Sequence, residues 1–434
     1  MISLRRRVLQ NSLLNLLASI SQRAGQALVF ILIARFLGDQ EAGAYNLANS
    51  YTSILLAFSL WGLDQLLIRE VARREELAAQ YLGGFLLLRL TLSLLLWAAL
   101  ALIMPLLPYS AESKHLVLVM ALSIIPASIS NLYQSIWIAF EDVRAISAVM
   151  LAFSILRVIG GALLLLLGQP ILWIGYLFFA VSVAELVANV WITSGQRRGR
   201  QVRIGGWRPD ARFWIDSLRT ATPLIIVSLV LIVEYQFDVV ILSLFRSEAQ
   251  VGVYSKASML LTLLLFLTRS YQLAVFPVIS RAYERGLESL QRVYGRSLSF
   301  LVGGALLIAM LVMALAEPAL QLLYGSGNQE AVTILRILVW AFVISAFNVP
   351  NSRLIIAADR QKVIAYFAIL SMTGNLALSL WLVPQYGGVG SAVARVAAMP
   401  LYSIPAFLYV QRRVCPLTWR HLLPGNPLRA PTER

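Results

Sequence analysis

Apolar runs of about 20 residues, separated by short polar segments, recur along the whole chain. A helix of this length crosses the hydrocarbon core of a bilayer, so the pattern predicts an all-α polytopic membrane protein. A β-barrel is excluded, because its strands alternate apolar and polar residues over roughly ten positions. Windows of about 20 residues predict about twelve transmembrane helices. They lie near residues 12–37, 44–68, 82–107, 116–140, 146–168, 171–193, 217–244, 251–278, 296–320, 331–357, 363–383 and 389–411.

The composition and the distribution of charge agree with this class. Hydrophobic residues make up 59% of the 434 residues and charged residues 13%, whereas soluble domains have about 25% charged residues. The net charge of +15 comes from arginines that cluster in alternate short loops, so we expect no nucleic-acid partner. This positive-inside pattern places the basic loops and both termini in the cytoplasm.

The longest basic loop, 194–214, divides the spans into six and six. We therefore predict an N-terminal lobe over 1–193, a cytoplasmic linker over 194–214, a C-terminal lobe over 215–411 and a basic cytoplasmic tail over 412–434. The charge run of the linker is interpreted as an anchor at anionic lipid headgroups. Recruitment of a partner enzyme is the alternative.

The two halves of the chain resemble each other. GAYNLANS at 43–50 matches GVYSKASM at 252–259, and the segment 128–142 parallels 345–359, with Asn131 on Asn348 and Asp142 on Asp359. Six spans per half is an even number, so the halves would form a parallel pseudo-repeat about an axis along the membrane normal. Such a repeat predicts two bundles flanking a central cavity. Chance similarity between apolar helices is the alternative.

Four arginines lie inside apolar segments, and each is expensive in bare hydrocarbon, at roughly 2.5–3.5 kcal/mol. They are Arg23, Arg89, Arg157 and Arg269. We expect them to face the protein interior or a wet cavity, where they would bind an anionic substrate. The alternative is that each is paired within the helix packing, and Glu185 is a candidate partner for Arg157.

Two carboxylates, Glu234 and Asp238, lie four residues apart in one predicted span and hence on one helical face. Two such groups repel each other in a membrane interior unless they bind a proton or a cation. Asn375 and Ser379, also four apart, could supply further oxygens for sodium. We expect the four residues to couple transport to a Na⁺ or H⁺ gradient. Pairing of the carboxylates with Arg336 or Arg395 is the alternative.

Two motifs carry a resemblance to a known family. ARFLGDQEAGAYNLA at 34–48 and WGLDQLLIREVAR at 61–73 resemble the polysaccharide (oligosaccharide) flippases of the MATE-like exporter superfamily. The second motif departs from the pattern, because Asp64 follows the glycine where an acidic residue more often precedes it. The resemblance implies a V-shaped pair of six-helix lobes. It also implies transport of an undecaprenyl-pyrophosphate-linked oligosaccharide across the bacterial inner membrane by alternating access.

The chain lacks the signatures of catalysis. None of its three lysines follows a glycine, so there is no Walker A loop, and His115 and His421 are isolated. We expect no enzyme activity, no cofactor and no firmly predicted metal site. The single cysteine, Cys415, excludes an internal disulfide.

The predicted partners are the membrane, the anionic lipid-linked oligosaccharide and glycosyltransferases or a glycan polymerase of the same pathway, with the protein acting as a monomer. The polymer could be O-antigen, capsule or exopolysaccharide. A multidrug or cation antiporter of the same superfamily is the first alternative function, and a membrane glycan polymerase is the second.

Overall fold

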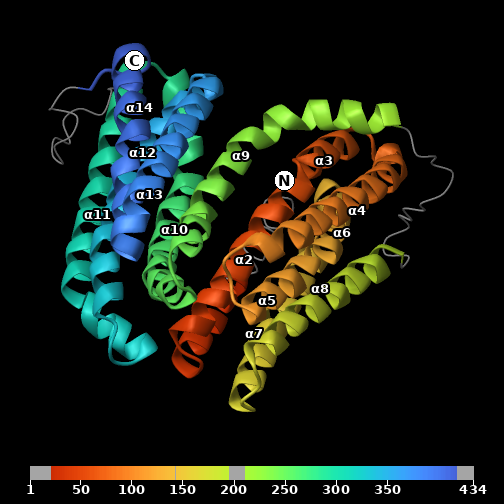
Figure 1. The fold of residues 1–434 in the computed structure, drawn as a ribbon. Helices are drawn as coiled ribbons and strands as arrows, with labels where there is room; N and C mark the ends of the chain where they lie inside the picture. The colour runs from red at the N-terminus through yellow and green to blue at the C-terminus, as the bar shows by residue number, and fades with distance from the viewer. Residues whose placement is uncertain (1–20, 142, 195–210, 418–434) are drawn as a thin grey trace. The chain divides into compact units, whose positions relative to one another are not determined.

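The computed structural model describes residues 21–141, 143–194 and 211–417, and every regular element in these ranges is helical. Residues 21–36 are helical and precede the first labelled helix (Figure 1). The longer helices are α2 (Asp39–Leu60), α3 (Leu63–Arg73), α4 (Ala78–Ile103), α5 (Ala111–Leu122), α6 (Ile124–Ala139), α7 (Val143–Leu166), α8 (Ile171–Ser194), α9 (Ala211–Phe245), α10 (Glu248–Glu284), α11 (Leu287–Tyr324), α12 (Gln329–Ala357), α13 (Gln361–Ala398) and α14 (Pro400–Arg413).

The helices match the predicted spans. Within the described ranges, nine helical segments are long and apolar enough to cross a membrane. The last of them, Gln361–Arg413, contains two predicted spans, because α13 bends at Gly387, where φ is 55° and ψ is −131°. Helix α9 contains a further predicted span, and residues 21–36 belong to the first, which begins outside the described residues. The prediction of an all-helical protein with about twelve spans is confirmed.

Helices α2 to α9 and the start of α10 form one compact unit, Met1–Ser255. Its apolar core includes Leu67 of α3, Phe85 of α4 and Ile136 of α6, none of which has exposed surface. Helix α9 joins this core through two indoles: Trp61 Nε1 donates to Thr222 Oγ1, and Trp214 Nε1 donates to the Gly84 carbonyl. Helix α9 therefore packs with the helices that precede it in the chain.

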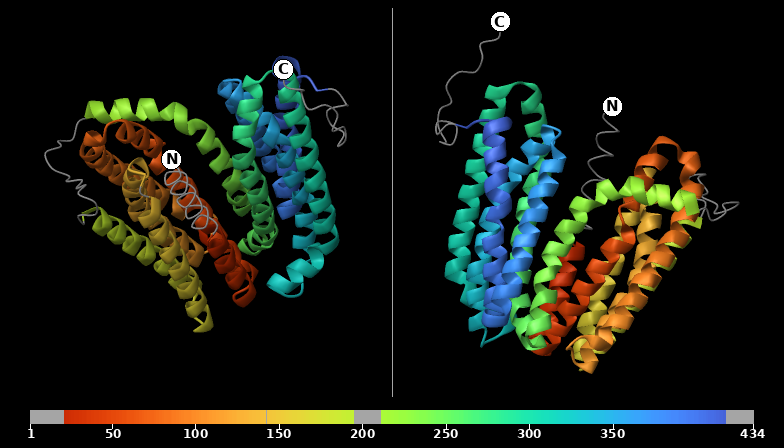
Figure 2. Two further views of the ribbon diagram at one scale, coloured as in Figure 1. Left: turned by 180° about the vertical axis from the view of Figure 1, so that it is seen from behind. Right: turned by 45° about the horizontal axis from the view of Figure 1, so that its top comes forward.

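The remainder of α10 and helices α11 to α14 form a second compact unit, Lys256–Arg434. Figure 2 shows α11, α12 and α13 of this unit running side by side. Tyr294 of α11 donates a 2.7 Å hydrogen bond to Asn351 Oδ1 of α12 within its core, and Cys415 is buried in the same cluster. The boundary between the units lies in α10, after the predicted linker, so the units do not coincide with the predicted lobes. The lobes divided at 194–214 stay a prediction.

The internal repeat is visible in how two helices end. After α6, Phe140 (φ −84°, ψ 4°) is followed by Glu141 with a positive φ of 59°. After α12, Ala358 (φ −83°, ψ 6°) is followed by Asp359 with a φ of 57°. Glu141 is therefore the structural equivalent of Asp359, one position before the predicted Asp142, which lies outside the described residues.

The repeat also places equivalent residues against each other. A Cβ added at Gly43 of α2 would clash with the Glu248 carbonyl, and one at Gly252 of α10 would clash with the Asp39 carbonyl. One helical turn further on, Asn46 Nδ2 donates a 2.6 Å hydrogen bond to Ser255 Oγ. The two helices therefore cross at backbone contact at the two glycines, within the first unit.

Candidate functional site

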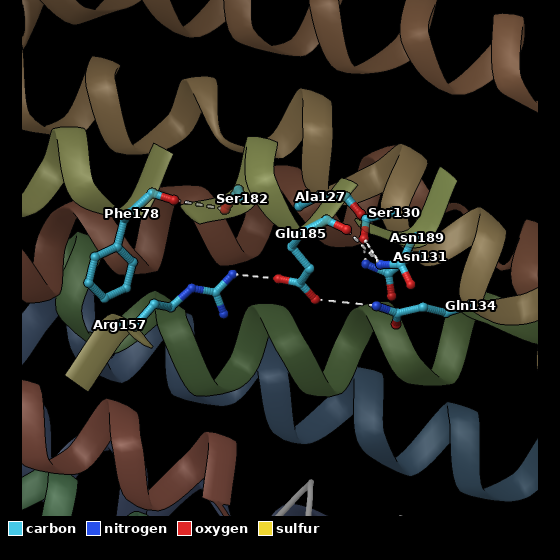
Figure 3. Close-up of polar contacts among 9 residues, drawn as sticks. All are labelled: Ala127, Ser130, Asn131, Gln134, Arg157, Phe178, Ser182, Glu185 and Asn189. Atoms are coloured by element: carbon cyan, nitrogen blue, oxygen red, sulfur yellow. Dashed lines mark hydrogen bonds and ion pairs between the residues drawn. The ribbon is translucent and has the colours of Figure 1, made fainter. Parts of the chain in front are cut away.

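A charged pair lies near the middle of two adjacent helices of the first unit. Arg157 Nη2 of α7 donates a 2.7 Å hydrogen bond to Glu185 Oε2 of α8 (Figure 3). The second oxygen, Glu185 Oε1, accepts a 3.3 Å hydrogen bond from Gln134 Nε2 of α6. The side chains of Arg157 and Glu185 are 18% and 15% exposed, so the pair is mostly buried but part of it stays accessible. Figure 3 shows the three side chains in one line between their helices.

The face of α8 that carries Glu185 is polar over about three turns. Its members are spaced three and four residues apart, which places them on one side of a helix: Ser182, Glu185, Asn189 and Thr193. Two residues of helix α6 form hydrogen bonds with this face. Ser130 Oγ accepts from Asn189 Nδ2 at 2.7 Å, and Trp137 Nε1 donates to Thr193 Oγ1 at 3.0 Å. We call these residues, together with Arg157 and Gln134, the α6–α8 polar network.

Arg157 keeps hydrogen-bonding capacity that the network does not use. An arginine has five N–H donors in a planar fork. Arg157 Nε is buried and has no hydrogen-bond partner among the residues that the structure describes. A partly exposed guanidinium can donate hydrogen bonds to a phosphate or carboxylate, for which its fork geometry is suited.

Arg89 forms an ion pair within the helix packing. Its side chain has no exposed surface, and it bonds Asp64 Oδ1 of α3 at 2.5 Å and the Ser128 carbonyl of α6 at 2.8 Å. Ser135 of α6 also donates to Asp64 Oδ1, at 3.0 Å. Arg89 is therefore paired within the packing of three helices, which was the alternative for each arginine, and its contact with substrate stays a prediction.

The other two predicted arginines stay predictions. Arg23 is exposed, whereas on the same helix a Cβ added at Gly25 would lie 3.0 Å from Ser154 Oγ of α7. The same Ser154 hydroxyl donates to the Ser21 carbonyl at 3.1 Å. Arg269 lies on α10 in the second unit, and its side chain is outside the described residues.

The predicted cation-coupling residues are described only in part. Asp238 of α9 is fully buried and accepts a 3.1 Å hydrogen bond from the Tyr254 hydroxyl, and the side chain of Glu234 is outside the described residues. Asn375 and Ser379 lie in the second unit, both buried in α13, and Ser379 Oγ donates to Asn375 Oδ1 at 3.4 Å. Within the described ranges no cluster of three acidic, histidine or cysteine residues could hold a metal ion. Coupling through these four residues stays a prediction.

Two sequence families match the chain. The family described as "Polysaccharide biosynthesis protein" matches residues 8–283, more than half of the chain, and the family MatE matches residues 223–381. Among curated proteins, "Probable flippase AglR" of Haloferax volcanii is 29% identical over 216 residues. That alignment covers 48% of this chain and 42% of AglR, so the chain matches less than half of the length of this relative.

Solved membrane transporters share the fold. An inward-facing multidrug resistance MATE family transporter of the MOP superfamily aligns with a TM-score of 0.73 and 17% identity, over 90% of this chain and 94% of that one. The lipid II flippase MurJ in an inward closed conformation aligns with a TM-score of 0.71 and 16% identity, over 94% of this chain and 89% of that one. These likenesses show a multi-span membrane protein with the fold of MOP-superfamily transporters. With the family match over residues 8–283, they establish that the chain belongs to the polysaccharide biosynthesis protein family.

Proposed function

We propose that this protein is a flippase that carries an undecaprenyl-pyrophosphate-linked oligosaccharide across the bacterial inner membrane by alternating access. The observation that carries the proposal is the partly exposed Arg157 in the α6–α8 polar network, with a buried donor left unused. Family membership and the flippase relative support the same class of activity. Both termini would lie in the cytoplasm, next to the enzymes that build or polymerise the glycan.

The substrate's parts match different features of the chain. Its polyprenyl tail is apolar and can stay in the bilayer. Its pyrophosphate needs a fixed positive charge, which Arg157 supplies and to which we add the predicted Arg23 and Arg269. Its sugars need hydrogen-bonding groups in an otherwise apolar helix bundle, and the partly exposed Gln134 supplies one.

The test is transport in proteoliposomes with a fluorescent polyprenyl-pyrophosphate oligosaccharide. The variant Arg157→Gln/Glu185→Gln removes both charges, leaves none unpaired and should abolish crossing. Its matched control is Arg292→Gln/Glu288→Gln, which neutralises an exposed pair in α11 and should transport normally. Absence of crossing with the unmodified protein would refute the flippase. Efflux of a cationic dye in its place would identify an antiporter.

The remaining predicted residues are tested in the same assay. Arg23→Ala and Arg269→Ala should each abolish crossing while insertion into the membrane is unchanged. We also propose that Glu234 and Asp238, with Asn375 and Ser379, couple transport to a sodium or proton gradient. Glu234→Gln/Asp238→Asn should then make crossing independent of either gradient, and unchanged ion dependence would give the pair a structural role.

A further inference from the structure

Two arginine ion pairs that lie within the helix packing of the first unit, Arg89–Asp64 and Arg157–Glu185, are built differently. Arg89 has no exposed surface, and it is bonded both to a carboxylate and to a backbone carbonyl. Arg157 is held to Glu185 through Nη2, and both members of its pair retain some exposure. In both arginines Nε is buried without a hydrogen-bond partner among the described residues, so exposure is what distinguishes the two pairs. The Arg157 pair is therefore the one that a second anion can reach and open.

An anion that binds Arg157 competes directly with Glu185. A phosphate oxygen that takes the Nη2 donor removes from the Glu185 carboxylate its short charge-assisted hydrogen bond, leaving the 3.3 Å bond from Gln134. A neutral amide cannot replace a cation as the partner of a shielded carboxylate. An unpaired carboxylate in such a place is driven to its neutral form, because desolvation disfavours the charge.

The described helices that pack against α8 carry few other charged or titratable groups. Helix α8 packs against α5, α6 and α7. The charged or titratable groups of α5 are Glu112, Lys114 and His115 at its start, where His115 contacts Tyr176, two and a half turns before Glu185 on α8. Helix α6 carries Tyr133, which packs in the core shared with α3 and α4.

The helices around Arg157 carry three further arginines. Arg144 lies 13 residues from Arg157 along α7, which is about 20 Å of helix. Tyr45 of α2 is buried in the vicinity of Arg157. On the helix at 21–36, which packs on α7 at Ser154, Arg23 and Arg35 are both exposed.

We propose that Glu185 is the internal counter-ion of Arg157, that an anionic phosphate ligand displaces it, and that Glu185 takes up one proton from water as the ligand binds. The inference rests on the proposed function, because it assigns the ligand's phosphate to Arg157. The Nη2–H···Oε2 bond is replaced by a bond from the same N–H to a phosphate oxygen, and the proton binds a Glu185 oxygen. Protonation of Glu185 thereby removes one negative charge from the interior as the ligand's phosphate enters.

The experiment counts protons during binding. Farnesyl diphosphate is titrated into the purified full chain in detergent, by calorimetry in two buffers of different ionisation enthalpy. We expect the unmodified chain to take up about one proton more per ligand than Glu185→Gln, and we expect Glu185→Gln to bind roughly tenfold more tightly because the internal competitor is gone. The ligand's own change of protonation cancels in this difference. Glu76→Gln, an exposed carboxylate after α3, is the control and should behave as the unmodified chain does.

The possible results separate the two proposals. Arg157→Gln/Glu185→Gln should lose farnesyl diphosphate binding, which identifies Arg157 as the cation that holds the ligand. Absence of binding by the unmodified chain would refute the proposed function. Binding by the unmodified chain with the same proton uptake in Glu185→Gln would overturn the role of Glu185 alone.

Discussion

Asp64 of α3 and Arg89 of α4 form an ion pair in which the arginine has no exposed surface. The chain brings them together by breaking a helix: Trp61 and Gly62, both with positive φ, end α2, and α3 begins at Leu63. Asp64 therefore stands in the first turn of α3, where its carboxylate meets the guanidinium and the Ser135 hydroxyl. Arg89, which the sequence suggests as a substrate contact, joins helices α3, α4 and α6 in this structure.

Removing one partner of this pair should destabilise the protein strongly. Asp64→Leu leaves the Arg89 charge buried without a counter-ion, and we expect a loss of about 3–5 kcal/mol in the free energy of unfolding. Asp64→Leu/Arg89→Met removes both charges and should recover most of that loss. Denaturation in mixed micelles measures both variants. A single variant as stable as the unmodified chain would contradict the structural role of the pair.

The glycine crossing of α2 and α10 should not tolerate a methyl group. Gly43→Ala and Gly252→Ala each place a Cβ against a backbone carbonyl, which cannot rotate away, so the helices must separate. We expect each to cost about 1–3 kcal/mol of stability, as overpacking does. Because both relieve the clash by the same separation, the double variant should cost less than the sum of the single ones.

The control for both variants is Gly303→Ala in α11. A Cβ there meets nothing within 4 Å, so the substitution should be neutral or stabilising by up to about 1 kcal/mol, as alanine replaces glycine in a helix. Equal effects at the three positions would show that the close approach of α2 and α10 does not matter.

The bend of α13 should depend on glycine at position 387. Its φ of 55° with ψ of −131° is a conformation that side-chain-bearing residues rarely adopt. Gly387→Ala should lower the free energy of unfolding by about 1–3 kcal/mol through backbone strain. The same denaturation assay measures it, with Gly304→Ala in α11 as the open-space control. An alanine variant of full stability would mean that the chain can bend there by other dihedrals.

Cys415 should report unfolding of the second unit. Burial raises the pKa of its thiol to about 11, so at pH 7 only about one molecule in ten thousand carries the reactive thiolate. We expect maleimide labelling of the folded protein to be slow and to accelerate with rising pH. Heating or detergent denaturation should expose the thiol and make labelling fast. Rapid labelling of the folded protein at pH 7 would contradict the burial of this residue.

The fold could be predicted because each membrane-spanning helix is marked by apolar residues along its whole length. Each span needs about 20 apolar residues in succession, and that signal survives uncertainty about any one position. The Arg157–Glu185 pair was among the sequence-based alternatives, since both lie in the middle of neighbouring spans. The polar face at Ser182, Glu185, Asn189 and Thr193 is also visible in the spacing of the sequence.

The site was harder to predict because partners depend on the path of the backbone. Asp64 precedes Arg89 by 25 residues and meets it only because the helix breaks at Trp61 and Gly62. Nothing in an apolar segment says which arginine is fully buried by packing and which stays partly exposed. The clash at Gly43 and Gly252 likewise follows from a three-dimensional approach that the repeated motif suggests but does not specify.

The reciprocal contact at Gly43 and Gly252 is the arrangement found at the interface of a two-fold symmetric dimer, where residue i meets residue j and j meets i. Here it occurs between two stretches of a single polypeptide. A duplicated gene that first encoded two identical subunits would give such a junction when its copies fused. A change on one side of the junction acts on both stretches at once, so the two glycines form one structural constraint rather than two independent ones.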